Sequence, residues 1–266
     1  MSFWESGAPR RKLSKPIRNR WARNFGLFIT SNLTARLAVP IFTVEASRLA
    51  MDQGWGVLPI LGTPLWLNLI LGFLLLDLVR YGLHWASHRY LILWRIHRVH
   101  HTDQEFDFTT SLRNHPIELL VITLLSVALI VVFGLHPLAV ILSEAVSLLI
   151  NTINHGNVRI NSKLDQLLRR VVVTPDMHRV HHSSLPREFN ANLGGLLTWW
   201  DRLFGTYVAQ PRLGHEAMSI GLPGYAKDDG GKFLSLLLDP FVSPAAEFIA
   251  PSSQQLDSSS AQVSKP

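Results

Sequence analysis

The sequence predicts an all-α integral membrane protein with about four transmembrane helices arranged in two hairpins. Charged residues make up 17% of the 266-residue chain, whereas soluble domains contain about 25%. Apolar segments recur at residues 58–79 and 119–153. Polar segments rich in histidine follow these apolar segments, so we expect them to form a helical cap at the membrane surface.

Residues 1–24 predict a basic N-terminal tail. Its lysines and arginines are opposed only by Glu5, a pattern typical of a cytoplasmic flank that faces lipid headgroups. Pro9 and Pro16 interrupt the segment, so we expect it to be flexible or to lie along the membrane surface without a fold of its own. No apolar signal-peptide core precedes residue 25, so we expect no cleavable signal.

The first hairpin is predicted at residues 24–51 and 58–79. Segment 24–51 is apolar but is interrupted by Pro40 and by charged residues, which favours a span packed against its neighbours over an interfacial helix. Segment 58–79 has about 22 residues with only Asp77 charged, enough to cross a hydrocarbon core of ~30 Å. It ends just before His84.

The second hairpin is predicted at residues 116–133 and 135–153, with Gly134 and Pro137 in its turn. Two hairpins return the chain to the side on which it started. The basic N-terminus, the histidine-rich segments and the C-terminus should therefore share one face, which the positive-inside rule makes cytoplasmic. We expect a bacterial cytoplasmic membrane.

The rest of the chain is predicted to be more polar. Residues 159–202 should form a second helical segment with a possible amphipathic helix at 163–173. Residues beyond Gly205 are predicted to form loops. Residues 251–266 are predicted to be disordered because they are rich in Ser and Gln.

Three histidine motifs carry the chemistry. His84 and His88 form HxxxH, and HRVHH occurs at residues 97–101 and again at 178–182. Each motif places its histidines on one helical face. Eight imidazoles exceed the four that close a tetrahedral zinc site, so the pattern predicts a histidine-rich dimetal site in the cytosolic cap. The chain has no cysteine, which excludes thiolate and iron–sulfur sites, while imidazole suits iron, copper, zinc or nickel.

Other classes of function fit less well. The net charge of +6 does not indicate nucleic-acid binding, because the basic residues flank apolar segments. No HExxH motif occurs, since Trp85 follows His84, so zincin-type hydrolysis is disfavoured. Histidines at the membrane edge favour redox chemistry on a lipid, and the alternative is a non-redox zinc protein, hydrolytic or structural, on the same cluster. No dinucleotide fingerprint is present, so electrons should come from a separate protein.

The order of these motifs and their relation to the apolar hairpins resembles the sterol desaturase and fatty acid hydroxylase superfamily, membrane-bound histidine-box di-iron oxygenases. Further matching stretches are RNHP with Glu118, NHGN at 154–157, TPDM at 174–177 and WWDRLFGT at 199–206. The resemblance covers residues 25–210. It implies a fatty acid hydroxylase-type membrane catalytic domain there, preceded by the tail 1–24 and followed by a loop-like, partly disordered tail at 211–266.

The resemblance implies two non-haem iron ions, O₂ as co-substrate and a membrane lipid, such as a sterol or a fatty acyl chain, that is hydroxylated or desaturated. A ferredoxin, cytochrome or reductase would supply electrons. The implied metal ligands are His84, His88, His97, His100, His101, His155, His178, His181 and His182. Three further residues are possible ligands or possible hydrogen-bond partners of the ligands: His115, Asn151 and Asp176. No catalytic residue distinct from the ligands is implied.

Polar neighbours should orient the histidines. The carboxylates predicted for this role are Asp77, Asp103, Asp107, Glu118 and Asp176. For Asp176 the simpler expectation is a helix N-cap before HRVHH. We expect Asp201 and Arg202 to pair structurally, and Trp199 and Trp200 to be interfacial anchors or a lid. His136 and His215 are expected to be bystanders.

Overall fold

The computed structural model describes residues 1–14, 17–225 and 231–242. These residues form helices and three isolated β-bridges, with no strand among them. Stretches long and apolar enough to cross a membrane lie at Ile17–Ile60, Leu65–Arg89, Pro116–Phe133 and Pro137–Asn154. The predicted all-α membrane fold is confirmed.

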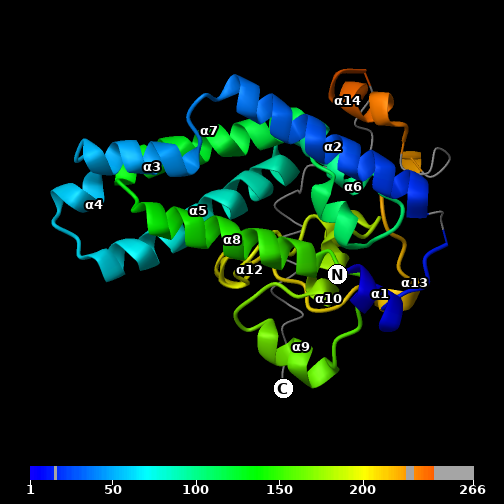
Figure 1. The fold of residues 1–266 in the computed structure, drawn as a ribbon. Coiled ribbons are helices and arrows are strands. Elements are labelled where there is room, and N and C mark those ends of the chain that lie inside the picture. The colour runs from blue at the N-terminus through cyan, green and yellow to red at the C-terminus, as the bar shows by residue number, and fades with distance from the viewer. Residues whose placement is uncertain (15–16, 226–230, 243–266) are drawn as a thin grey trace.

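The long helices form the two predicted hairpins (Figure 1). Helices α2 (Ile17–Ala38) and α3 (Thr43–Asp52) lead away from the histidine-rich end, and α5 (Leu65–Arg89) returns to it. Helices α7 (Pro116–Phe133) and α8 (Pro137–Asn154) repeat this path. Helix α2 packs on α7, and α5 packs on α8. The N-terminus and α6, α10, α13 and α14 gather at the opposite end from the hairpin turns (Figure 1).

The turns of the two hairpins touch backbone to backbone. Gly56 and Gly134 both have positive φ angles, of 106° and 65°. A Cβ atom on Gly56 would lie 2.1 Å from the Gly134 nitrogen, so only glycine fits there. Beside this contact lies the short α4 (Val57–Ile60), and Leu58 of α4 joins a buried cluster with Leu76 and Ile130.

The outer surface of the hairpins is apolar. Only 22% to 28% of the most apolar window of each spanning stretch is buried inside the protein. Large apolar side chains that stay exposed include Ile29, Leu33, Leu37, Trp66, Ile70, Leu124, Val132, Leu148 and Leu149. A surface of this kind is stable against lipid rather than water.

The spans differ from expectation in two ways. The first is broken, because α2 ends at Ala38 and α3 begins at Thr43, around Pro40, which cannot donate a helical hydrogen bond. The second begins later than residue 58, at Leu65, and continues without a break to Arg89. The first histidine motif is therefore part of the spanning helix itself.

The expectation that residues 1–24 have no fold of their own is wrong. They form α1 (Ser2–Gly7) and the start of α2. One Glu5 oxygen accepts from the backbone N–H groups of Phe108 and Asn157, each at 2.8 Å. Arg20 is fully buried and pairs with Asp103 and Asp107, in each case at 2.8 Å. These partners lie far along the chain, so local composition could not reveal them.

The cap is built from short helices and turns. They are α6 (Leu91–His101), η1 (Phe108–Leu112), α9 (Ser162–Leu168), α10 (Pro175–His181), α11 (Pro186–Phe189), α12 (Trp199–Leu203), α13 (Gly214–Ala217), η2 (Pro223–Tyr225) and α14 (Phe233–Val242). Helix α9 ends five residues before the predicted end. Helix α14 was predicted to be loop; it packs on α2 and α6 through buried Leu236 and through the Arg98–Asp239 ion pair of 2.8 Å. Residues 251–266 lie outside the described part.

Candidate metal centre

Nine histidines converge at the end of the hairpins in two groups. The ligand atoms within each group lie within 4.8 Å of one another. The five-histidine group consists of His84, His88, His97, His101 and His181. The four-histidine group consists of His100, His155, His178 and His182. These are the nine residues predicted as ligands.

Each HRVHH motif contributes to both groups. In α6, the first and last histidines of the motif join the five-histidine group, while His100 joins the other. In α10 the assignment is reversed, and only His181 joins the five-histidine group. The two motifs thus exchange their middle histidines, which ties the two groups into one centre. The rings of His101 and His182, one from each group, lie 4.8 Å apart.

Backbone carbonyls fix the orientation of several rings. Since a carbonyl oxygen only accepts, the ring nitrogen Nδ1 that contacts it carries the hydrogen. Such contacts join His84 to Leu193 O (2.7 Å), His155 to Asn151 O (2.7 Å), His181 to Ala191 O (2.9 Å) and His100 to Arg113 O (3.3 Å). In the neutral form of each of these rings, Nε2 keeps a free lone pair.

Pairs of these unprotonated Nε2 atoms lie close to each other. The Nε2 atoms of His100 and His155 lie 3.1 Å apart, and those of His84 and His181 lie 3.0 Å apart. Two lone pairs at this distance repel unless a cation lies beside both. Nitrogen ligands ~2.1 Å from a metal at angles of roughly 90° to 110° lie about 3.0 to 3.4 Å apart. The arrangement therefore fits one metal ion in each group.

Burial keeps the histidines outside the spans neutral. It lowers the pKa of His155 to about 4 and that of His181 to about 3. Burial, with the nearby histidines, also lowers the pKa values of His100, His101, His178 and His182. Neutral imidazole is the form that binds metal.

Acidification is expected to destabilise the metal-free protein. The unfolded chain takes up protons at these histidines below about pH 6.5, whereas the folded chain resists protonation until the lower folded pKa values. The stabilisation is thus complete above pH ~6.5 and is lost as pH falls below this value; for His155 and His181 the free energy of unfolding drops by about 1.4 kcal/mol per pH unit each until the folded pKa is reached. Thermal unfolding of chelator-treated protein at pH 7.5 and 5 measures this. Equal midpoints at the two pH values would contradict it.

Glu118 is the predicted carboxylate that contacts a histidine of the centre. It lies in the first turn of α7, and one of its oxygens accepts from Nδ1 of His97 at 2.6 Å. A carboxylate in this position fixes the tautomer and raises the basicity of the opposite ring nitrogen. The Nε2 atom of His97 lies 3.2 Å from that of His101.

A loop that the sequence did not single out supplies two of the orienting carbonyls. Residues 191–194 carry the oxygens that accept from His181 and His84. The buried carboxylate of Asp201 accepts from the N–H groups of Leu193 (2.7 Å) and Gly194 (2.9 Å). Asn192, with φ of 54°, donates to Met177 O. No local motif encodes these contacts, because they join α12 and α10 to an irregular segment.

The three possible additional ligands are not members of either histidine group. His115 is the N-cap of α7: its Nδ1 accepts from Ile117 N, and its Nε2 contacts Leu237 O at 3.1 Å. Both ring nitrogens are thus occupied. Asn151 lines the cavity described below. The predicted N-cap role of Asp176 is wrong, because Thr174 caps α10; Asp176 instead pairs with Arg10 and Arg179.

The remaining predicted residues have structural contacts. Asp103 and Asp107 bind Arg20, and Asp77 accepts from Trp200 Nε1 at 2.8 Å. Asp201 holds the loop rather than bonding to Arg202, whose guanidinium donates to Arg169 O. Trp199 donates to Arg170 O. His136 caps α8, and His215 lies 3.6 Å from Asp176, so both lie outside the two groups.

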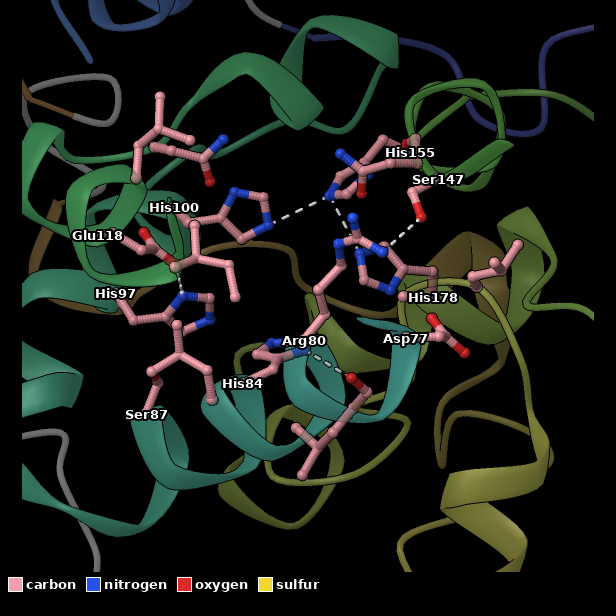
Figure 2. A pocket seen from close by; sticks show the side chains of 18 of the residues that line it. Asp77, Arg80, His84, Ser87, His97, His100, Glu118, Ser147, His155 and His178 are labelled. Carbon is pink, nitrogen blue, oxygen red and sulfur yellow. Dashed lines mark hydrogen bonds and ion pairs between the residues drawn. The ribbon is translucent and has the colours of Figure 1, made fainter. Parts of the chain in front are cut away.

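A cavity of about 300 Å³ opens on both groups of histidines (Figure 2). His84 and His97 line it from the five-histidine group, and His100, His155 and His178 from the four-histidine group. Apolar side chains from the spans complete the wall; they are Leu83, Leu119, Ile122 and Leu148. A ligand in this cavity would be held between the spans and within reach of both metal positions.

The family model of fatty acid hydroxylases matches residues 69–206, about half of the chain. The chain belongs to this family. The matched region contains all nine converging histidines, the loop 191–194 and Asp201. Family membership confirms the resemblance found in its motifs.

The curated relatives are lipid hydroxylases and monooxygenases. The chain is 32% identical over 180 residues to ornithine lipid hydroxylase OlsE of Rhizobium tropici. This alignment covers 67% of the chain and 51% of the relative. It is 30% identical over 141 residues to alkylglycerol monooxygenase of Xenopus tropicalis and 29% identical over 143 residues to that of Homo sapiens. These matches cover 53% and 52% of the chain and 30% of each relative. The chain thus spans between 30% and 51% of the length of these relatives. No solved structure matches.

Proposed function

We propose that the protein is a membrane-bound non-haem di-iron oxygenase that hydroxylates a lipid with O₂ and electrons from a separate protein. The observation that carries this proposal is a cavity that borders both histidine groups and has apolar residues of the spans in its wall. A donor set made only of imidazoles, with no cysteine in the chain, suits iron. The names of the relatives support hydroxylation over desaturation.

The two groups would each hold one iron ion. When bound, the iron pair supplies the activation of O₂ that oxidation of an unactivated C–H bond requires. In the overall reaction one oxygen atom enters the C–H bond, and the other leaves as water with two electrons and two protons from the donor. The protein's own part is to hold the rings in one tautomer, through Glu118 and the backbone carbonyls, and to exclude water with Leu83, Leu119 and Ile122.

We further propose that the centre and the N-terminus face the cytoplasm of a bacterium. Helix α1 and the start of α2, in a basic part of the sequence, lie at the end of the hairpins away from their turns (Figure 1), and the positive-inside rule places such an end in the cytoplasm. The C-terminus, which we predicted on the same side, lies outside the described residues. We keep 25–210 as the proposed catalytic unit; the matched residues 69–206 fall within it.

The test is lipid analysis of cells with and without the intact protein, grown under ¹⁶O₂ or ¹⁸O₂. The proposal predicts a lipid that gains one oxygen atom, labelled by ¹⁸O₂, only when the protein is present. Loss of two hydrogen atoms instead would indicate desaturation. A product formed without O₂ or reductant would favour the alternative, a non-redox zinc protein.

A further inference from the structure

Arg80 is the one lysine or arginine among the described residues that line the cavity. It lies on α5 four residues before His84, so the two side chains share a helical face. It is nine residues from the end of a spanning helix, roughly 13 Å along the axis. A charge at this depth is costly unless it is paired or lines a cavity, and such residues commonly have a function.

Arg80 forms no close ion pair, although the carboxylates of Asp77 and Glu144 act on its charge from a greater distance. Its Nη1 donates to the hydroxyls of Ser143 (2.9 Å) and Ser147 (3.1 Å) on α8. The cavity carboxylates are engaged elsewhere, Asp77 with Trp200 and Glu118 with His97. Among the described residues, no carboxylate lies within ion-pairing distance of Arg80. A guanidinium has five N–H donors, so most of them remain for a ligand.

The walls of the cavity differ in polarity. On α8, Ser147, Asn151 and His155 line the cavity at intervals of four residues, which makes one polar face. From α7, Leu119 and Ile122 line the cavity together with Glu118, which bonds to His97, and Leu148 of α8 adds a further apolar side chain. Figure 2 shows Arg80 reaching across the pocket toward Ser147, with His155 and His178 beside it. The polar wall suits a headgroup, and the apolar wall suits a hydrocarbon chain.

We propose that Arg80 binds the anionic group, carboxylate or phosphate, of the lipid substrate. Guanidinium recognises both anions through paired hydrogen bonds. Arg80 is one helical turn, about 6 Å along the axis, from His84. The oxidised carbon therefore lies within a few bonds of the anionic group and not far along an acyl chain. The position of oxidation rests on the proposed hydroxylase function, whereas binding of the anion does not require turnover.

The test measures binding to the iron-loaded full chain in neutral maltoside micelles under anaerobic conditions. The probes are dodecanoate, dodecyl phosphate and uncharged dodecanol, followed by the rise in unfolding temperature with concentration. At least one anionic amphiphile is expected to bind about tenfold or more tightly than dodecanol, in line with a charge-assisted hydrogen bond. R80Q should remove most of this preference, and R80K should keep part of it. R89Q, which removes a charge that stacks on Trp85 outside the cavity lining, should match the wild type.

Three outcomes would overturn the proposal. Equal binding of dodecanoate and dodecyl phosphate by R80Q and wild type would mean that the anion is held elsewhere, for example by the metal. Acetate or inorganic phosphate competing as well as the amphiphiles would mean that a free anion is the ligand. Oxidation far along an acyl chain would show that the anionic group of the substrate is not bound next to the reacting carbon, as Arg80 requires. If no lipid is oxidised but binding of the anion still depends on Arg80, the hydroxylase function fails and the anion site stands.

Discussion

Replacement of His181 by alanine is expected to abolish lipid hydroxylation and to reduce bound iron. His181 is the one histidine of its motif that crosses to the five-histidine group, and its Nε2 faces that of His84 at 3.0 Å. Its loss opens the coordination of one metal ion and removes a link between the groups. Loss of an outer-shell partner typically costs 10- to 100-fold, so loss of a ligand should cost roughly 100-fold or more. Iron content and labelled product, measured together on purified protein, check this.

The matched control is His136→Asn. His136 caps α8 through its side chain in the turn of the second hairpin, and asparagine also caps helices. This variant should keep both iron and activity. Full iron and unchanged product in His181→Ala would show that the five-histidine group is not a metal site.

Glu118→Ala is expected to weaken iron binding and activity by about 10- to 100-fold, because His97 loses the carboxylate that fixes its tautomer. The carboxylate acts on His97 directly, since an oxygen of Glu118 lies 2.6 Å from His97 Nδ1. The variant keeps all nine histidines, so the centre should still form at high iron concentration. Anaerobic titration with ferrous iron, followed by product assays at saturating iron, separates affinity from turnover.

Glu144→Ala provides the control for Glu118. Glu144 is the other carboxylate of the second hairpin and accepts from the Thr43 hydroxyl on α3 at 2.6 Å, a contact with no histidine in it. Its removal should leave iron affinity unchanged even if it lowers the unfolding temperature. Equal iron affinity of Glu118→Ala and wild type would refute the orienting role.

The sequence predicted the parts of the site that depend on local spacing. Helical periodicity was enough to place the histidines of each motif on one face, and the apolar segments indicated both hairpins. The division of the nine histidines into groups could not be predicted, because the exchange of His100 and His181 depends on how α6 and α10 face each other. Spacing within one motif contains no information about that packing.

Carboxylates were the weakest part of the prediction for a similar reason. Of the five expected to orient histidines, Glu118 does so, whereas Asp103 and Asp107 neutralise the buried Arg20. Arg20 was assigned to a headgroup-facing tail because its neighbours in sequence are basic. A buried charge without a partner is costly, and the two partners of Arg20 lie more than eighty residues away along the chain. The carbonyls of loop 191–194 leave no signature in side-chain chemistry at all.

Metal analysis of the full-length protein, purified without oxygen or chelators, tests the central claim most directly. We expect two iron ions per chain, one for each histidine group. A single metal ion per chain, or zinc in place of iron in both groups, would contradict it.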